Sequence, residues 1–263
     1  MAVACEIWMT DLRQHTPAAL RQRLAELDAT EHCRHASLRL PDDRARFVLG
    51  ASLVRGAAAL RLDTAPSDVV VDRRCPRCGA SHGRPTLPGT GLYVSVSHSA
   101  DLVVVALTAA GPVGIDVERI DSPRLSRHVP TSPAPEAGAS PGHTAPDTIG
   151  LGNGPSADLS ARAASTLPIL LGEGETRPTS TAAFYTTWCR KESVVKATGD
   201  GMRVALTDVL VTPSAEPPRL LAYPCGVRDA LMTDLELADG YAGALTLLTR
   251  QAAPLEFTVR TAP

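Results

Sequence analysis

Residues 121–183 constrain the fold most, because this stretch cannot build a hydrophobic core of its own. It holds nine of the 22 prolines and no aromatic residue, and most of it is Ala, Ser, Thr and Gly. Such a composition buries too little apolar surface to offset the entropy that a chain loses on ordering. We therefore predict a flexible insertion over 121–180, with only a short helix near 159–171, between an N-terminal half (1–120) and a C-terminal half (181–263).

Hydrophobic periodicity predicts helices and strands in both halves. In the N-terminal half we expect strands at 3–9, 93–97, 102–108 and 113–117 and helices at 17–27 and 45–62. In the C-terminal half we expect a helix at 184–198 and strands at 204–212 and 241–248. The pattern indicates an α+β fold in which the second half weakly repeats the first.

Charge and hydropathy weigh against several functions. The formal net charge is −2, so no overall field favours nucleic acid or an anionic membrane. No window approaches 18 uninterrupted apolar residues, and residues 1–10 do not resemble a signal peptide, so we expect a cytoplasmic protein. The six cysteines are expected to be free thiols. Residues 34–84 are locally basic, with ten arginines against five aspartates, which suits an anionic ligand or an acidic partner.

Only two of the 26 basic residues are lysines, and both lie beside Glu192: Lys191 and Lys196. Since the chain uses arginine for ordinary positive charge, we interpret these lysines as positions that need a compact ammonium on a flexible stem. The segment around them has the pattern of a helix that ends at Gly199. In a helix Glu192 and Lys196 lie four residues apart, one above the other. The alternatives are chance and an ordinary surface ion pair.

Two carboxylates end the strand predicted at 113–117. Asp116 and Glu118 are two residues apart, so they point to one side of the strand while Ile115 and Val117 face the core. Like charges in this arrangement repel, and a hard divalent cation such as Mg²⁺ relieves the repulsion. Simple solvent exposure at the strand end is the alternative. Taken with Glu192 and Lys196, the pair favours a metal site.

Two further motifs carry polar side chains that suit a ligand or a metal. Ser97, His98 and Ser99 lie at a strand end, where hydroxyls and an imidazole can donate to phosphate oxygens. Cys75 and Cys78, in Cys-Pro-Arg-Cys-Gly, have the spacing of a zinc knuckle, with His82 as a third ligand. A second Cys-x-x-Cys is absent, so structural zinc stands beside an unmetallated loop as an open alternative.

Taken together, these motifs resemble those of the 4'-phosphopantetheinyl transferase superfamily, in its Sfp-like, pseudo-dimeric class. Gly-Ile-Asp-Val-Glu at 114–118 and Trp-Cys-Arg-Lys-Glu-Ser-Val-Val-Lys at 188–196 carry the resemblance, with Ser-His-Ser at 97–99 and Gly-Arg-Pro at 83–85. The resemblance covers residues 3–120 and 181–250. It implies two similar α/β halves related by pseudo-twofold symmetry.

The resemblance also implies the activity and the residues that perform it. The activity is Mg²⁺-dependent transfer of 4'-phosphopantetheine from coenzyme A to a serine of an acyl or peptidyl carrier protein, releasing adenosine 3',5'-bisphosphate. Mg²⁺ would be held by Asp116, Glu118 and Glu192 with the coenzyme A pyrophosphate. Glu192 is the candidate to accept the serine proton, while Lys196 and His98 would neutralise phosphate charge. Positions expected to bind coenzyme A are Arg46, Arg84, Pro85, Ser97, His98, Asp116 and Lys196.

The implied partners are apo carrier proteins of fatty acid, polyketide or nonribosomal peptide biosynthesis, which a monomeric enzyme would modify. Neither nucleic acid nor a membrane is expected as a partner. In the family, the stretch between the two acidic elements helps to engage the carrier protein. Here that stretch is the predicted insertion, and it departs from the family pattern.

Two other functions fit parts of the sequence. A metal-dependent nuclease also combines Asp, Glu and Lys, but its last acid and lysine usually lie two apart on a strand, whereas Glu192 and Lys196 are four apart on a predicted helix. A zinc-knuckle binding module would use Cys75, Cys78 and His82, with the acidic residues merely exposed.

Overall fold

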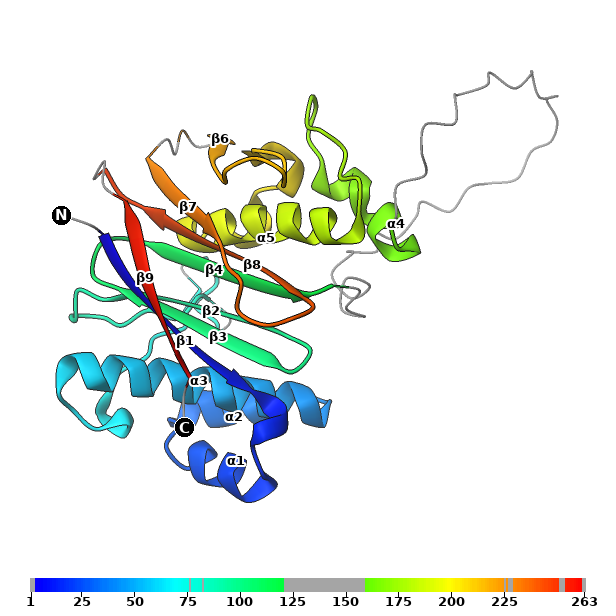
Figure 1. The fold of residues 1–263 in the computed structure, drawn as a ribbon. Helices are drawn as coiled ribbons and strands as arrows, with labels where there is room; N and C mark the ends of the chain where they lie inside the picture. Colours follow the sequence, from blue (N-terminus) through cyan, green and yellow to red (C-terminus); the bar gives the residue numbers. More distant parts are fainter. Residues whose placement is uncertain are drawn as a thin grey trace, which may run out of the picture.

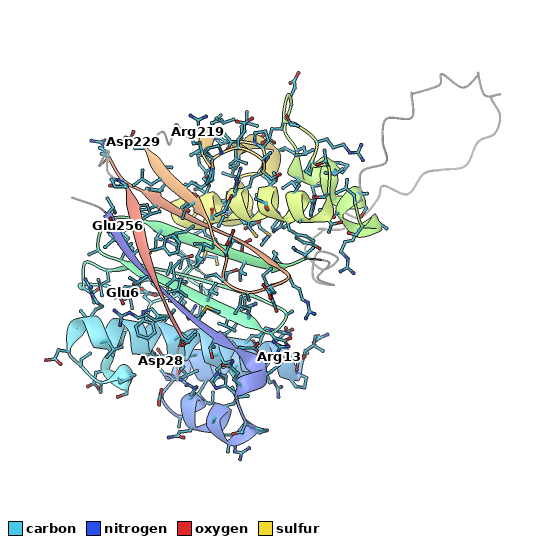
Figure 2. All side chains as sticks on the ribbon, viewed as in Figure 1. Glu6, Arg13, Asp28, Arg219, Asp229 and Glu256 are labelled. Carbon is cyan, nitrogen blue, oxygen red and sulfur yellow. The ribbon has the colours of Figure 1, made fainter. Side chains whose placement is uncertain are left out.

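Helices cover both outer sides of two β-sheets (Figure 1). The computed structural model describes residues 3–75, 77–81, 83–120, 159–224, 226, 229–250 and 254–261. Helices α1, α2 and α3 lie on the outer side of one sheet, and α5 lies against the other (Figure 1). Figure 2 shows that side chains fill the space between these layers. No helix in the described ranges is both long and apolar enough to span a membrane.

The N-terminal half is built on the long helix α3. Its elements are β1 (Val3–Asp11), α1 (Pro17–Leu24), α2 (Ala29–Ser37), α3 (Pro41–Leu62), β2 (Tyr93–Ser99) and β3 (Leu102–Thr108), with 3-10 turns at Leu12–Gln14 and Pro66–Asp68. Leu49, Leu53 and Val54 of α3 pack against Val103 and Val105 of β3 in one buried cluster.

In the rest of the chain, helix α5 lies against the second sheet. The elements that follow β3 are β4 (Val113–Arg119), which ends the predicted N-terminal half, then α4 (Ala161–Leu170), α5 (Thr181–Thr198), β5 (Leu210–Val211), β6 (Leu220–Ala222), β7 (Ala230–Asp234), β8 (Tyr241–Leu248) and β9 (Leu255–Thr261), with 3-10 turns at Gly201–Arg203 and Leu206–Asp208. Helix α5 begins after Ser180, whose side chain accepts from Ala183 N, and ends at Gly199 with a left-handed φ of 77°. Glycine adopts this conformation without steric cost, so the predicted end of the helix is confirmed.

The two main sheets share one strand order. One sheet has the order β2-β3-β1-β9 and the other β4-β8-β7. In each, the first strand (β1 or β4) pairs antiparallel with the second strand of a hairpin (β2–β3 or β7–β8). A mixed α+β fold is therefore confirmed. The shared order agrees with two similar halves, and the twofold axis stays a prediction.

Most predicted elements are present, and two differences have physical reasons. The strand predicted at 204–212 is wrong except at Leu210–Val211, because this run forms a 3-10 turn at Leu206–Asp208. Its apolar side chains, among them Leu206 and Val209, pack with Val194 and Val195 of α5. Helix α2 is missing from the sequence-based prediction because it has no apolar stripe. Its one buried residue is Glu31, so tertiary contacts rather than periodicity place it.

The predicted insertion falls partly outside the described residues. Residues 121–158 are not described, so their predicted flexibility is untested. The short helix expected near 159–171 is present as α4, and Ala163, Leu167 and Leu170 pack with Phe184 of α5 in a buried cluster. Residues 159–180 therefore belong to the packed C-terminal part of the structure.

Candidate active site

Helix α5 can lie directly on β4 because residue 114 is a glycine. A Cβ atom at Gly114 would come 1.9 Å from Ser193 O and 2.5 Å from Ala197 N, closer than real Cβ contacts allow. The missing side chain lets the helix backbone touch the strand. This approach brings the α5 residues Glu192 and Lys196 to the pocket that Asp116 of β4 also lines.

One pocket of about 370 Å³ collects nearly all of the residues that the sequence singles out. Its predicted lining residues are Arg46, Pro85, Ser97, His98, Asp116, Glu118, Glu192 and Lys196. The remaining walls come from side chains that the sequence-based prediction did not include: Phe47, Gly50, Ala51, Arg73, Val96 and Trp188. Strands β2 and β4 and helices α3 and α5 all contribute, so the pocket forms only when both halves meet.

The strand carboxylates point into this pocket as expected, and serines of β2 contact them. Asp116 Oδ1 accepts hydrogen bonds from Ser97 Oγ at 2.9 Å and from Lys196 Nζ at 2.6 Å. Glu118 Oε2 accepts from Ser99 Oγ at 2.6 Å. Asp116 is 3% exposed, and its buried Oδ2 atom has no hydrogen-bond partner among the residues that the structure describes. The site therefore holds a carboxylate oxygen with an unused lone pair.

The charged groups in this pocket shift one another's pKa values. Burial, and then the charge of Asp116, raise the pKa of Glu192 from 4.5 to about 7, although Lys196 opposes the shift. Burial alone would lower the pKa of Lys196, but the charges of Asp116 and Glu192 outweigh it and raise that pKa. The Lys196 ammonium is thus held in its charged form among the carboxylates. Its ion pair is with Asp116, not with Glu192 as the helical spacing had suggested.

The donor set fits a hard divalent cation. Asp116, Glu118 and Glu192 supply carboxylate oxygens, the ligands that Mg²⁺ takes in proteins, and among the described residues Asp116 Oδ2 has no hydrogen-bond partner. Within the described ranges, no three His, Cys, Asp or Glu side chains are already gathered as a metal cluster. The Lys196 ammonium contacts Asp116 and offsets part of the acidic charge there.

Two arginines, Arg46 and Arg73, also line the pocket. Arg46 is buried, and it donates from Nε to Ala100 O at 2.6 Å and pairs with Asp43 at 2.7 Å. Arg73 approaches Glu31 at 3.6 Å and lies over the Phe47 ring at 5.7 Å. Burial lowers the pKa of Arg73. The basic stretch 34–84 indicated an anionic ligand. Because it holds ten arginines with no local feature to tell them apart, the sequence did not identify Arg73 as a residue of the pocket.

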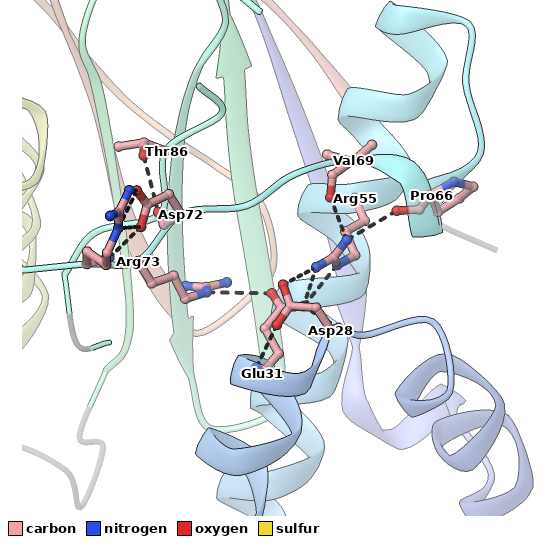
Figure 3. Close-up of polar contacts among 9 residues, drawn as sticks. Asp28, Glu31, Arg55, Pro66, Val69, Asp72, Arg73 and Thr86 are labelled. Atoms are coloured by element: carbon pink, nitrogen blue, oxygen red, sulfur yellow. Dashed lines mark hydrogen bonds and ion pairs between the residues drawn. The ribbon is translucent and has the colours of Figure 1, made fainter. Parts of the chain in front are cut away.

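Glu31 contacts two arginines, Arg73 and the buried Arg55 (Figure 3). Arg55 donates to Glu31 Oε2 at 2.7 Å and to Asp28 Oδ2 at 2.7 Å. It also donates to Val69 O at 2.6 Å. Arg55 is therefore a structural residue, because its guanidinium is bound by two carboxylates at the start of α2 and by a backbone carbonyl after α3.

Arg84 lies beside the pocket rather than in its lining. Its guanidinium donates to Ala197 O at 2.9 Å, at the C-terminal end of α5. A Cβ atom at Gly199 would lie 2.9 Å from the Arg84 guanidinium carbon. In the structure Arg84 therefore caps the helix that carries Lys196, and a direct contact with a ligand stays a prediction.

Lys191 has a structural position. Its side chain is fully buried, and its ammonium donates to Leu170 O at 2.7 Å, to Leu206 O at 3.0 Å and to the Glu175 carboxylate. Burial lowers the pKa of Lys191, and Glu175 counteracts this. The two lysines thus serve different purposes, since Lys196 faces the pocket and Lys191 joins α5 to the chain after α4.

Zinc at the Cys-x-x-Cys turn finds no support. Cys75 and Cys78 are free thiols, and backbone N–H groups of Cys78 and Arg77 lower the pKa of Cys75. His82, the expected third ligand, lies outside the described residues. No metal-ligand group of three occurs in the part of the chain that the structure describes.

Comparisons with known proteins point to one family. The family model described as the 4'-phosphopantetheinyl transferase superfamily matches residues 165–245, which include the whole of α5. The chain is also similar to the 4'-phosphopantetheinyl transferase HetI of Nostoc sp. (strain PCC 7120 / SAG 25.82 / UTEX 2576). The two are 26% identical over 223 residues, which cover 83% of this chain and 78% of that relative.

Proposed function

We infer that this chain, a member of the 4'-phosphopantetheinyl transferase superfamily through its match at residues 165–245, transfers 4'-phosphopantetheine from coenzyme A to a serine of an acyl or peptidyl carrier protein. One observation carries the proposal. Asp116, Glu192 and Lys196 line one pocket together with Arg46 and Arg73, a combination that suits an anionic, metal-bound diphosphate. The similarity to HetI over most of the chain supports the same activity.

Glu192 is proposed to accept the proton of the attacking serine. A general base works best when its pKa lies near the working pH, and burial has raised the pKa of Glu192 to about 7. A carboxylate at its usual pKa would be a weaker base. This pKa belongs to the protein without metal, in which burial brings Glu192 close to the pKa of an effective base.

Lys196 is proposed to stabilise the transferred phosphoryl group. Its ammonium is charged and partly exposed to the pocket, 29% by side chain, so it can exchange part of its contact with Asp116 for a phosphate oxygen. Fixed positive charge in a largely enclosed site stabilises charge that develops in a transition state. Transfer then releases adenosine 3',5'-bisphosphate as the leaving group.

Asp116, Glu118 and Glu192 are proposed to hold Mg²⁺ with the coenzyme A pyrophosphate. When bound, this ion would neutralise charge on the bridging and leaving phosphate oxygens. His98 and Arg46 line the same pocket and are proposed to bind coenzyme A phosphates, with Pro85 and Ser97 beside them. Arg84 is proposed to help from its place at the end of α5.

The wider setting is also proposed from the resemblance. The carrier protein would approach the mouth of the pocket, and the enzyme would act as a cytoplasmic monomer whose halves are related by a pseudo-twofold axis. The predicted insertion at 121–180, of which residues 159–180 are packed in the structure, is proposed to influence partner recognition. The structure does not support the alternative of a metal-dependent nuclease, because Glu192 and Lys196 lie on a helix rather than on a strand.

Mass spectrometry tests the activity directly. An apo carrier protein incubated with this enzyme, coenzyme A and Mg²⁺ should gain the mass of 4'-phosphopantetheine on one serine. Asp116→Asn, which keeps the shape of the side chain and removes its charge, should abolish the gain while the protein stays folded by circular dichroism. No modification of a panel of carrier proteins by the wild-type enzyme would contradict the proposal.

A further inference from the structure

A line of serine hydroxyls joins the two sheets where no backbone ladder does. Strand β2 ends one sheet and β4 ends the other, and within the described ranges the two do not pair. Three serines of β2 instead accept hydrogen bonds from backbone N–H groups of β4. The pairs are Ile115 N to Ser95 Oγ at 3.1 Å, Val117 N to Ser97 Oγ at 3.3 Å and Arg119 N to Ser99 Oγ at 3.0 Å.

We call Ser95, Ser97 and Ser99 the serine seam. Alternate residues of a strand point the same way, so the Ser-x-Ser-x-Ser spacing places three hydroxyls along one edge. All three serines are buried. The N–H groups of an edge strand need partners when they are buried, and the seam supplies them.

Two hydroxyls of the seam also donate to a carboxylate. Ser97 Oγ donates to Asp116 Oδ1 at 2.9 Å, and Ser99 Oγ donates to Glu118 Oε2 at 2.6 Å. Ser95 differs, because in the described structure the one hydrogen bond of its hydroxyl is the one accepted from Ile115 N. A serine hydroxyl has one proton and two lone pairs, so an N–H that fixes one lone pair also restricts where the proton points.

We propose that Ser99 is a positioning residue that orients Glu118 for metal binding. The inference rests on the proposed function, since it takes Glu118 as a metal ligand. Ser99 is fully buried and is not part of the pocket lining, so it reaches a bound metal only through Glu118. Ser97 also accepts a hydrogen bond from Lys196 Nζ at 2.9 Å. A substitution of Ser97 would therefore disturb Lys196 as well, so Ser99 is the more selective position to test.

Mn²⁺ binding, measured by electron paramagnetic resonance without carrier protein, tests this role. Titrations are made on the full chain, alone and with coenzyme A. Ser99→Ala should raise the dissociation constant for Mn²⁺ by about 10- to 100-fold, the usual effect of losing a residue that orients a metal ligand. Ser99→Thr, which keeps the hydroxyl, should restore much of the affinity.

Ser95→Ala is the matched control. It removes the same kind of buried acceptor from the same seam, but no contact with a carboxylate. Both alanine variants should lower the melting temperature, because each removes the hydroxyl to which a backbone N–H of β4 donates. Only Ser99→Ala should weaken Mn²⁺ binding. Should Ser99→Ala not fold, Ser99→Cys keeps nearly the same size with a weaker donor and should show the same metal defect.

The outcomes separate the inference from the proposed function. If the wild type binds Mn²⁺ and Ser99→Ala or Ser99→Cys binds it equally well, the positioning role is wrong and the proposed function stands. An equal loss of affinity in Ser95→Ala and Ser99→Ala also contradicts it, since the seam would then act only by joining the sheets. If the wild type binds no Mn²⁺ even with coenzyme A, the metal site fails and the inference fails with it.

Discussion

Lys196 Nζ lies 2.6 Å from Asp116 Oδ1, although the two residues are 80 positions apart in the sequence. The contact joins α5 to β4, and Ser97 of β2 completes it with a hydrogen bond to each side chain. One hydrogen-bonded group therefore links helix α5 of the C-terminal half to strands β2 and β4 of the N-terminal half. Substitutions in this hydrogen-bonded group should lower the rate of transfer more than they lower the free energy of unfolding.

Lys196→Arg should not preserve activity even though it preserves charge. The guanidinium is planar and longer, so it would displace either the carboxylate or the phosphate that the ammonium is proposed to meet. Misplacing reacting groups by about 1 Å can reduce the rate on the order of 100-fold. The measurement is kcat/KM with coenzyme A varied. Lys196→Ala should be at least as damaging, and near wild-type activity in Lys196→Arg would refute the proposed role.

Lys191→Met should destabilise the fold rather than change the chemistry. It leaves the Glu175 carboxylate buried without the ammonium that faces it. Removing one partner of a buried ion pair costs about 3–5 kcal/mol of unfolding free energy, measurable by urea denaturation. Because Lys191 is buried, Lys191→Arg should also destabilise by overpacking. The double variant Lys191→Met with Glu175→Gln should recover part of the loss, which a catalytic role for Lys191 does not explain.

Gly114→Ala should separate α5 from β4. Its new Cβ atom would overlap Ser193 O and Ala197 N, both of them backbone atoms that cannot rotate away. Overpacking of this kind typically costs about 1–3 kcal/mol, and the shift should also lower kcat. Gly56→Ala in α3 is the control, because nothing lies within 4 Å of its added Cβ atom. The control should be neutral or stabilise by about 0.5–1 kcal/mol, since alanine favours helix over glycine.

Glu192 should make the metal-free protein less stable as pH rises from about 4.5 to 7. Its pKa is about 7 in the folded state against 4.5 for the free side chain, so within this window the folded state binds a proton that the unfolded state has released. Stability from this group is greatest below pH 4.5 and is lost as pH passes the folded pKa. The shift corresponds to on the order of 3 kcal/mol.

Urea denaturation at several pH values, with a chelator present, measures this dependence. Glu192→Gln, which does not titrate, should flatten the curve over the same window. Adding Mg²⁺ should stabilise the wild type most above pH 7, where the carboxylate is charged. An identical pH profile for wild type and Glu192→Gln would show that Glu192 is not held protonated in the folded protein.

Local patterns in the sequence were enough to identify the elements that carry the site. Alternation predicted the strands with Asp116 and Glu118 on one side, and Gly199 predicted the end of the helix with Glu192 and Lys196. These features depend on neighbours within a few residues, so periodicity and capping reveal them.

Tertiary structure alone decided which residues meet. The pairing of Lys196 with Asp116 rather than Glu192, the burial of Lys191 and the place of Arg73 in the pocket all depend on contacts between distant segments. The same holds for the serine seam, because spacing shows that three hydroxyls share an edge but not which strand faces them. Local spacing specifies the direction of a side chain within its own element, whereas its partner is set by how the elements pack.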